Sequence, residues 1–73
     1  MRTEPAREML AALGRRVREA RVRRGLTQLD LAQAAELSVA YVSLIERGGR
    51  NPPLTTVVSL ARALGVGVTE LVT

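Results

Sequence analysis

Apolar residues recur along this chain at the three- and four-residue spacing of an amphipathic helix, and the pattern stops and restarts four times. In the first stretch, about residues 6–24, the apolar positions run from Leu10 to Ala20, and Gly25 is expected to end the helix. The same spacing predicts further helices over about 28–35, 39–47, 54–64 and 68–72.

The helix over 54–64 is framed by Pro53, which suits a helix start, and by Gly65, which suits a helix end. Residues 1–5 have no periodic pattern and are expected to form a flexible tail, so residues 6–73 make a single domain. No repeat or second domain is visible. The predicted fold class is therefore all-α, with five helices. The residues expected to be buried in the fourth helix are Leu54, Val57, Leu60, Ala61 and Leu64.

Two of these helices follow each other closely, and each has a capping residue in front of it. Thr27 precedes the stretch 28–35, and Asp30 three residues later completes a capping-box-like pair. Ser38 precedes the stretch 39–47 and is expected to cap it. A connection of only about three residues forces a steep crossing, which is the geometry of a helix-turn-helix. Such a unit presents its second helix outward, where it can enter the major groove of DNA.

Seven short segments in and around this unit form a linked pattern. They are Leu13–Arg18, Leu26–Gln28, Leu31–Ala32, Leu37–Ser38, Tyr41–Gly48, Arg50–Pro52 and Leu60–Val66. At these segments, and over residues 10–72 as a whole, the chain resembles the phage-repressor/Cro-like helix-turn-helix family, also called the xenobiotic-response-element type. The resemblance implies a compact five-helix, lambda-repressor-like fold. It also implies a transcription regulator that binds double-stranded DNA, and a homodimer on a palindromic operator is expected.

The composition narrows the possible functions. The chain has 73 residues, a formal net charge of +4 and eleven cationic side chains, all of them arginine, which favours a polyanionic partner. Because cysteine and histidine are absent, we expect no enzyme activity, no metal site and no cofactor. No apolar run is long enough to span a membrane and no signal peptide is visible. We therefore expect a cytoplasmic protein, associated with the nucleoid when bound to DNA.

The first turn of the second motif helix is the surface expected to face the bases. Its residues are Val39, Ala40, Tyr41 and, slightly further on, Ser43. Val39 and Ala40 could contact a thymine methyl group, and Ser43 could bond to a base or a phosphate. The alternative is that Val39 and Ala40 are only tolerated surface residues and that Ser43 is a small spacer. Glutamine, asparagine and arginine are absent from this turn, so few bidentate base contacts are available. Specificity is then expected to depend on arginines outside the helix or on DNA shape.

A second group of residues is expected to contact the DNA phosphates. Gln28 begins the first motif helix, where free N–H groups and the helix dipole favour an anion, and the resemblance implies the same role. The alternative for Gln28 is a solvated residue, and for Arg47 a cation that only complements the dipole of its helix. The expected phosphate contacts are Gln28, Ser38, Arg47, Arg50 and Asn51.

Two further expectations rest on the resemblance. In this family the positions of Arg21 and Glu46 form a largely buried ion pair, so we expect a structural role for both residues. The position of Glu36 is most often glycine in the family, because the backbone there tends to positive φ. Glutamate can adopt that conformation at a cost of about 1–2 kcal/mol. An ordinary exposed loop acid is the equal alternative.

The fifth helix is the expected site of dimerisation. Its apolar residues exceed what so short a helix can bury, and a leftover apolar patch favours a two-fold partner. The alternative is that these residues cap the core of a monomer. Antitoxins and restriction–modification controllers also belong to this family, so a toxin or RNA polymerase could be a further protein partner. The residues expected at the dimer interface are Val66, Val68, Leu71 and Val72.

The first helix is rich in arginine. These side chains could form a nucleic-acid patch, but a charged helix face is more often a solvated one, and we expect the latter. In that role they raise the long-range attraction to DNA without making individual contacts. The residues concerned are Arg15, Arg16, Arg18, Arg23 and Arg24.

Overall fold

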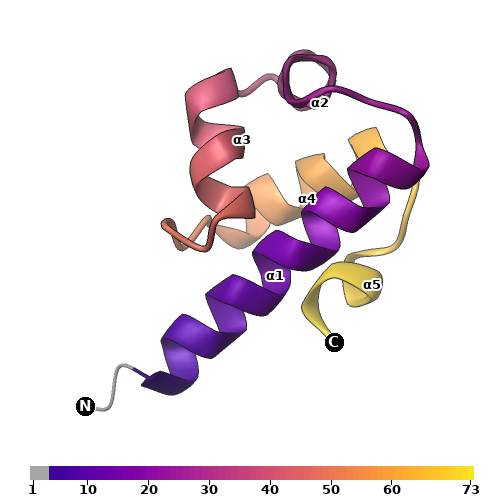
Figure 1. The fold of residues 1–73 in the computed structure, drawn as a ribbon. Coiled ribbons are helices and arrows are strands. Elements are labelled where there is room, and N and C mark those ends of the chain that lie inside the picture. The colour runs from indigo at the N-terminus through magenta and orange to yellow at the C-terminus, as the bar shows by residue number, and fades with distance from the viewer. Residues whose placement is uncertain (1–3) are drawn as a thin grey trace.

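The computed structural model describes residues 4–73, and the regular structure in that range consists of five helices (Figure 1). They are α1 (Glu4–Arg23), α2 (Gln28–Ala35), α3 (Val39–Glu46), α4 (Leu54–Leu64) and α5 (Val68–Val72). In the view of Figure 1, α1 crosses in front of α4, α2 and α3 lie above them, and α5 lies below. The all-α fold class expected from the sequence is confirmed.

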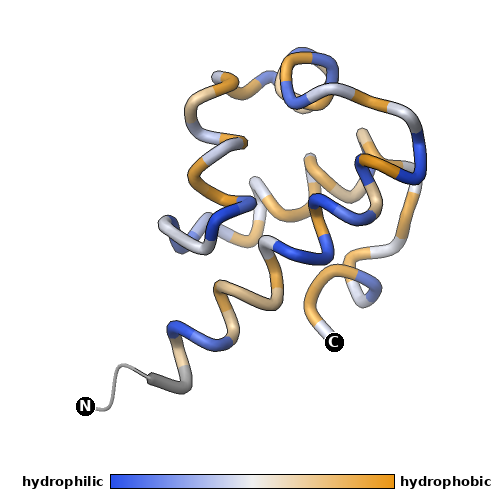
Figure 2. The backbone as a smooth tube through the Cα atoms, viewed as in Figure 1, coloured by the Kyte–Doolittle hydropathy of each residue, from blue (hydrophilic) through white to orange (hydrophobic). Residues whose placement is uncertain are grey.

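One aliphatic core joins all five helices. α1 packs against α3, α4 and α5, whereas α4 also packs against α2 and α5. Hydrophobic and hydrophilic residues alternate along each helix in Figure 2, as expected for helices with one side on a core. Each large aliphatic side chain that is fully buried stabilises the fold by about 1.5–3 kcal/mol. The largest of these side chains are Val17, Leu31, Val42, Ile45, Leu60, Leu64 and Leu71.

The helix boundaries agree with the expected ones to within two residues. α1 begins at Glu4, so the two residues before Ala6 are helical rather than part of the expected flexible tail, whose residues 1–3 lie outside the described range. α1 ends at Arg23 and α3 at Glu46, each one residue earlier than predicted. None of the described helices combines the length and the apolar character needed to cross a bilayer.

Two apolar residues lie differently from the sequence prediction. Leu71, predicted at a dimer interface, is only 1% exposed, because α5 turns it into the core against α1 and α4; that prediction is wrong for this residue. Val66 and Val68 are half-buried against the same core, so Val72, 51% exposed, is the residue of this group with a largely free surface. Leu54, predicted to be buried, is 69% exposed because the first position of α4 lies at the edge of the core.

Arg24 was expected to be one of the solvated arginines of the first helix, but it has a structural role. Its Nη1 donates a hydrogen bond to the carbonyl oxygen of Leu64 at 2.8 Å. The last carbonyl groups of a helix have no partner within the helix, so this contact caps the end of α4. Gly65 follows with φ +70°, and its missing side chain leaves room for the Arg24 guanidinium.

The turn between α2 and α3 places Glu36 in the left-handed region. Its backbone has φ 59° and ψ 44°, and its N–H group points to the carbonyl oxygens of Ala32 and Gln33. Leu37 then donates its N–H to the carbonyl oxygen of Ala32 at 2.8 Å, which completes the end of α2. The positive φ that the resemblance implies is therefore present, in a residue that carries a Cβ atom.

Glu36→Gly is expected to raise the free energy of unfolding by about 0.5–1 kcal/mol. Glycine removes the left-handed strain of about 1–2 kcal/mol, and its greater freedom in the unfolded chain offsets part of that gain. Urea unfolding followed by circular dichroism measures the change as a higher midpoint at unchanged slope. Glu36→Ala is the matched control, because alanine removes the charge but keeps the Cβ atom. Equal stability of the two variants would contradict the strain argument.

Candidate nucleic-acid interface

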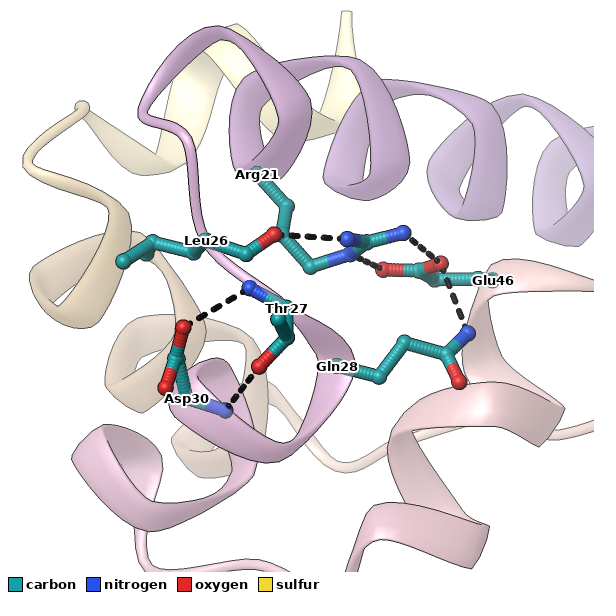
Figure 3. Close-up of polar contacts among 6 residues, drawn as sticks. All are labelled: Arg21, Leu26, Thr27, Gln28, Asp30 and Glu46. Carbon is teal, nitrogen blue, oxygen red and sulfur yellow. Dashed lines mark hydrogen bonds and ion pairs between the residues drawn. The ribbon is translucent and has the colours of Figure 1, made fainter.

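Hydrogen-bonded caps fix the start of α2 and α3. Thr27 Oγ1 accepts a hydrogen bond from the backbone N–H of Asp30, and Asp30 Oδ2 accepts one from the N–H of Thr27, both at 2.9 Å (Figure 3). The backbone N–H of Thr27 thereby lowers the pKa of Asp30. The box is complete while this carboxylate is ionised, and its contribution is lost as the pH falls through the lowered pKa. Ser38 Oγ accepts from the N–H of Tyr41 at 3.1 Å, as its position predicts.

Arg21, Gln28 and Glu46 form one hydrogen-bonded cluster where α1, α2 and α3 meet (Figure 3). Arg21 donates from Nε to Glu46 Oε2 at 2.6 Å and from Nη2 to Oε1 at 3.1 Å, so the ion pair is bidentate. The third nitrogen of Arg21, Nη1, donates to the carbonyl oxygen of Leu26 at 2.7 Å. The side chains of Arg21 and Glu46 are 12% and 3% exposed, so the pair is largely buried, as the resemblance implies.

Gln28 belongs to the same cluster, a contact that was not among its expected roles. Its Nε2 donates to Glu46 Oε1 at 3.1 Å, so this carboxylate binds α1 and α2 to the last residue of α3. The hydrogen bond that Arg21 itself donates to Glu46 raises the pKa of Arg21, so the guanidinium keeps its charge. Gln28 and Glu46 are 18 positions apart, and no local sequence pattern connects two residues at that separation.

The start of α2 keeps free hydrogen-bond donors. The capping box uses the N–H groups of Thr27 and Asp30. Between them, the N–H groups of Gln28 and Leu29 have no partner in the described part of the chain. Two adjacent free N–H groups at the positive end of a helix dipole favour an anion such as a phosphate.

The four residues predicted to face the bases differ in exposure. Val39 is 44% exposed and Ala40 is also exposed, so the first turn of α3 presents these two side chains to solvent. Tyr41 and Ser43 are half-buried, and the Tyr41 ring packs against the core. The outermost part of the α3 surface is therefore small and apolar.

The predicted phosphate contacts after α3 lie on an exposed connection. Arg47 is the C-terminal cap residue of α3, and Arg50 and Asn51 follow it; all three are exposed. Gly48 turns the chain with φ +77°, and a Cβ built on it would lie 3.1 Å from the Cα atom of Ala11 in α1. The connection after α3 therefore packs closely against α1 at Gly48, while its cations, Arg47 and Arg50, are exposed to solvent.

Gly14 is a further structural residue that the sequence analysis does not single out. A Cβ atom built on it would lie 2.5 Å from the carbonyl oxygens of both Ile45 and Glu46. Only glycine therefore allows α1 to approach the end of α3 this closely. A glycine inside a strongly helical pattern is the signal that could have indicated the contact, because it costs helix stability unless packing requires it.

The comparisons with known proteins agree with this geometry. A family model described as Helix-turn-helix matches residues 17–71. The HTH-type transcriptional regulator DdrOP3 of Deinococcus deserti is 50% identical over 56 residues, which cover 77% of this chain and 43% of that protein. The Immunity repressor protein of Bacillus phage phi105 is 43% identical over 60 residues, covering 82% and 42% of the two chains. The chain thus spans about two fifths of the length of these two relatives.

Solved structures include a protein of similar fold and comparable length. The restriction-modification controller protein C.AhdI from Aeromonas hydrophila superimposes with a TM-score of 0.83 at 42% identity, covering 85% of this chain and 94% of that one. The family match extends over α2, α3 and α4, and it includes the capping box, the turn and the ion pair. The chain belongs to the helix-turn-helix family of DNA-binding transcriptional regulators.

Proposed function

We propose that this chain is a cytoplasmic regulator that binds a palindromic operator as a homodimer, with α3 of each subunit in a major groove. The observation that carries the proposal is that three groups suited to bind a phosphate lie close together. They are the free N–H groups at the start of α2, the Gln28 side chain and Arg47. The free N–H groups of α2 begin at Gln28, whose amide bonds to the last residue of α3, and Arg47 follows that residue directly. A phosphate strand beside the groove could meet all of them while the exposed first turn of α3 faces the bases.

Each residue has a role within this proposal. Val39 and Ala40 make apolar contacts with base edges, and Tyr41 and Ser43 lie beside them. Because this surface offers few hydrogen-bonding groups, DNA shape supplies part of the specificity. The phosphate contacts are Gln28, Ser38, Arg47, Arg50 and Asn51, with Ser38 limited to what its capping role leaves free.

The binding of double-stranded DNA by this chain is expected to weaken steeply with salt. Arg47 and Arg50 of two subunits supply four ionic phosphate contacts. At about −0.9 per neutralised phosphate, these four contacts should give a slope of log K against log salt on the order of −3 to −5. Fluorescence anisotropy with a labelled duplex of random sequence measures the slope over a series of salt concentrations. Absent binding at low salt, or binding indifferent to salt, would refute the proposal.

Two variants separate the role of the bases from that of the phosphates. An operator is first selected from a pool of random duplexes. Val39→Glu should abolish the preference for this operator over random DNA, whereas Arg50→Ala should weaken both by similar factors, since a phosphate contact carries no sequence information. If Arg50→Ala changes the preferred sequence and Val39→Glu does not, the assignment of roles is wrong.

The dimer surface needs a new location, because Leu71 is in the core. Three of the most exposed large apolar side chains line one hollow of about 370 Å³ between α1, α4 and α5. They are Met9, Leu54 and Val72, which are 71%, 69% and 51% exposed. An apolar patch on so small a domain favours a second copy, and a two-fold axis lets the patch meet itself. Two subunits also read more bases than one α3 surface can.

Leu54→Glu and Val72→Glu are expected to convert the dimer to a monomer. Each places a carboxylate in the hollow, where a second copy would have to bury it. Sedimentation at micromolar concentration measures the state, and circular dichroism checks that the helices remain. Val22→Glu is the matched control, because Val22 is 57% exposed and lies outside the hollow. A wild-type chain that stays monomeric alone and on a palindromic duplex rules out the dimer. A dimer that survives both variants rules out this surface.

The second candidate is a restriction–modification controller protein, which is also a DNA-binding regulator. The similarity to C.AhdI over nearly all of that chain favours it. A restriction-enzyme gene next to the gene for this chain would support the controller, whereas a toxin gene would support an antitoxin.

A further inference from the structure

An exposed basic strip lies on α1, outside the helix-turn-helix. Arg15 and Arg18 line one shallow hollow together with Glu19, Val22 and Arg23. The Arg15 and Arg18 side chains are exposed, and neither forms an ion pair or a hydrogen bond with another side chain in the part of the chain that the structure describes. Arg15 and Arg18 therefore take no part in the Arg21–Glu46 ion pair or in the capping contacts described above.

The position of Arg18 on α1 follows from its neighbours. Gly14 faces the last carbonyl groups of α3, and Arg21 bonds to Glu46 at the end of the same helix. Arg18 is four residues after Gly14 and three before Arg21, so all three lie on the same side of α1. Arg18 thus lies along the contact between α1 and the end of α3, the end from which Arg47 continues.

Arg15 lies near the connection after α3. Gly48 lies directly against Ala11, and Arg15 is one turn of α1 further on. By contrast, Arg16 lines a pocket of about 210 Å³ with Val66, Glu70 and Leu71, so it lies on the side of α1 that faces α5. It also lines the hollow between α1, α4 and α5. Arg15 and Arg18 therefore lie on the side of α1 next to the end of α3 and its connection, whereas Arg16 lies on the α5 side and Arg23 lines both pockets.

We infer that Arg15 and Arg18 bind phosphates of the same DNA duplex, so that the phosphate-binding surface extends from the helix-turn-helix onto α1. The inference rests on the proposed DNA binding. A DNA strand carries a continuous row of phosphates. Guanidinium groups that have no other partner and lie next to a phosphate-binding surface can therefore bind the neighbouring phosphates of the same strand. These contacts fix the orientation of the domain on the duplex and carry no sequence information.

The test compares charge-matched variants on a labelled duplex of random sequence. Arg18→Gln and Arg15→Gln should each make the slope of log K against log salt shallower by about 1.8 for a dimer, which is about 0.9 for each lost phosphate contact. The double variant should return to the slope of −3 to −5 that the helix-turn-helix arginines supply alone. The control is Arg62→Gln, which removes the same charge from an exposed residue of α4. Circular dichroism confirms that each variant is folded.

The outcomes separate this inference from the proposed function. If Arg15→Gln and Arg18→Gln behave like Arg62→Gln while the wild type binds DNA with a steep slope, the α1 cations act only through long-range attraction and the inference fails alone. If the wild type does not bind the duplex at low salt, the proposed function fails. A shallower slope for the two α1 variants, with an unchanged slope for Arg62→Gln, is the result expected.

Discussion

Glu46→Ala is expected to lower the free energy of unfolding by about 3–5 kcal/mol, because it leaves the largely buried Arg21 guanidinium without its counter-charge. Arg21 would keep only its hydrogen bond to the carbonyl oxygen of Leu26, and the Gln28 amide would lose its acceptor. A domain of this size is typically stable by about 4–11 kcal/mol, so the loss is a large fraction of the total. Urea unfolding followed by far-ultraviolet circular dichroism measures it.

Two comparisons show whether the stranded charge causes the loss. Glu70→Ala removes an exposed carboxylate and should change stability by no more than about 0.5 kcal/mol. The double variant Arg21→Met/Glu46→Leu removes both charges, and it should be more stable than Glu46→Ala because no unpaired ion remains. If Glu46→Ala costs no more than Glu70→Ala, the ion pair does not hold α1, α2 and α3 together.

Gly14→Ala is expected to destabilise the fold by about 2–3 kcal/mol. The added methyl group would meet the carbonyl oxygens of Ile45 and Glu46 at 2.5 Å, and backbone atoms cannot move aside as a flexible side chain can. The better helix propensity of alanine, about 1 kcal/mol, offsets only part of this cost. Relief requires α1 and α3 to move apart, which also strains the Arg21–Glu46 pair. Urea unfolding measures the loss.

Gly25→Ala is the matched control for Gly14→Ala. Gly25 has φ +70°, but no atom outside its immediate neighbours lies within 4 Å of the added methyl group, so the cost is limited to left-handed strain of about 1–2 kcal/mol. The ordering of the two variants is the informative result. Gly14→Ala with wild-type stability would show that α1 and α3 tolerate a wider separation.

The elements of this fold could be predicted because their signals are local. Helical periodicity, the capping residues Thr27 and Ser38, and the glycines after α1 and α4 each act within a few residues of the position they specify. The five helices were placed to within two residues for this reason. The start of α3 at Val39 follows from the same signals, since the cap residue Ser38 determines which turn comes first.

Burial was harder to predict because it depends on what covers a residue. Leu54 and Leu71 are equally apolar, yet Leu54 is 69% exposed at the edge of the core and Leu71 is 1% exposed inside it. Periodicity shows which side of a helix is apolar, but the length and position of the neighbouring helices decide how much of that side is covered. The prediction of the dimer interface failed at Leu71 for this reason.

By itself, the sequence determined the helices, their caps, the sharp turn and the basic charge, since each depends on neighbouring residues or on composition alone. The tertiary structure decided which distant groups meet: Gln28 with Glu46, Gly14 with the end of α3, and Arg24 with the end of α4. It also placed Arg15 and Arg18 on one side of α1 and Arg16 on the side that faces α5. Such contacts join residues 18 to 40 positions apart, and only the packing of whole helices brings these residues together.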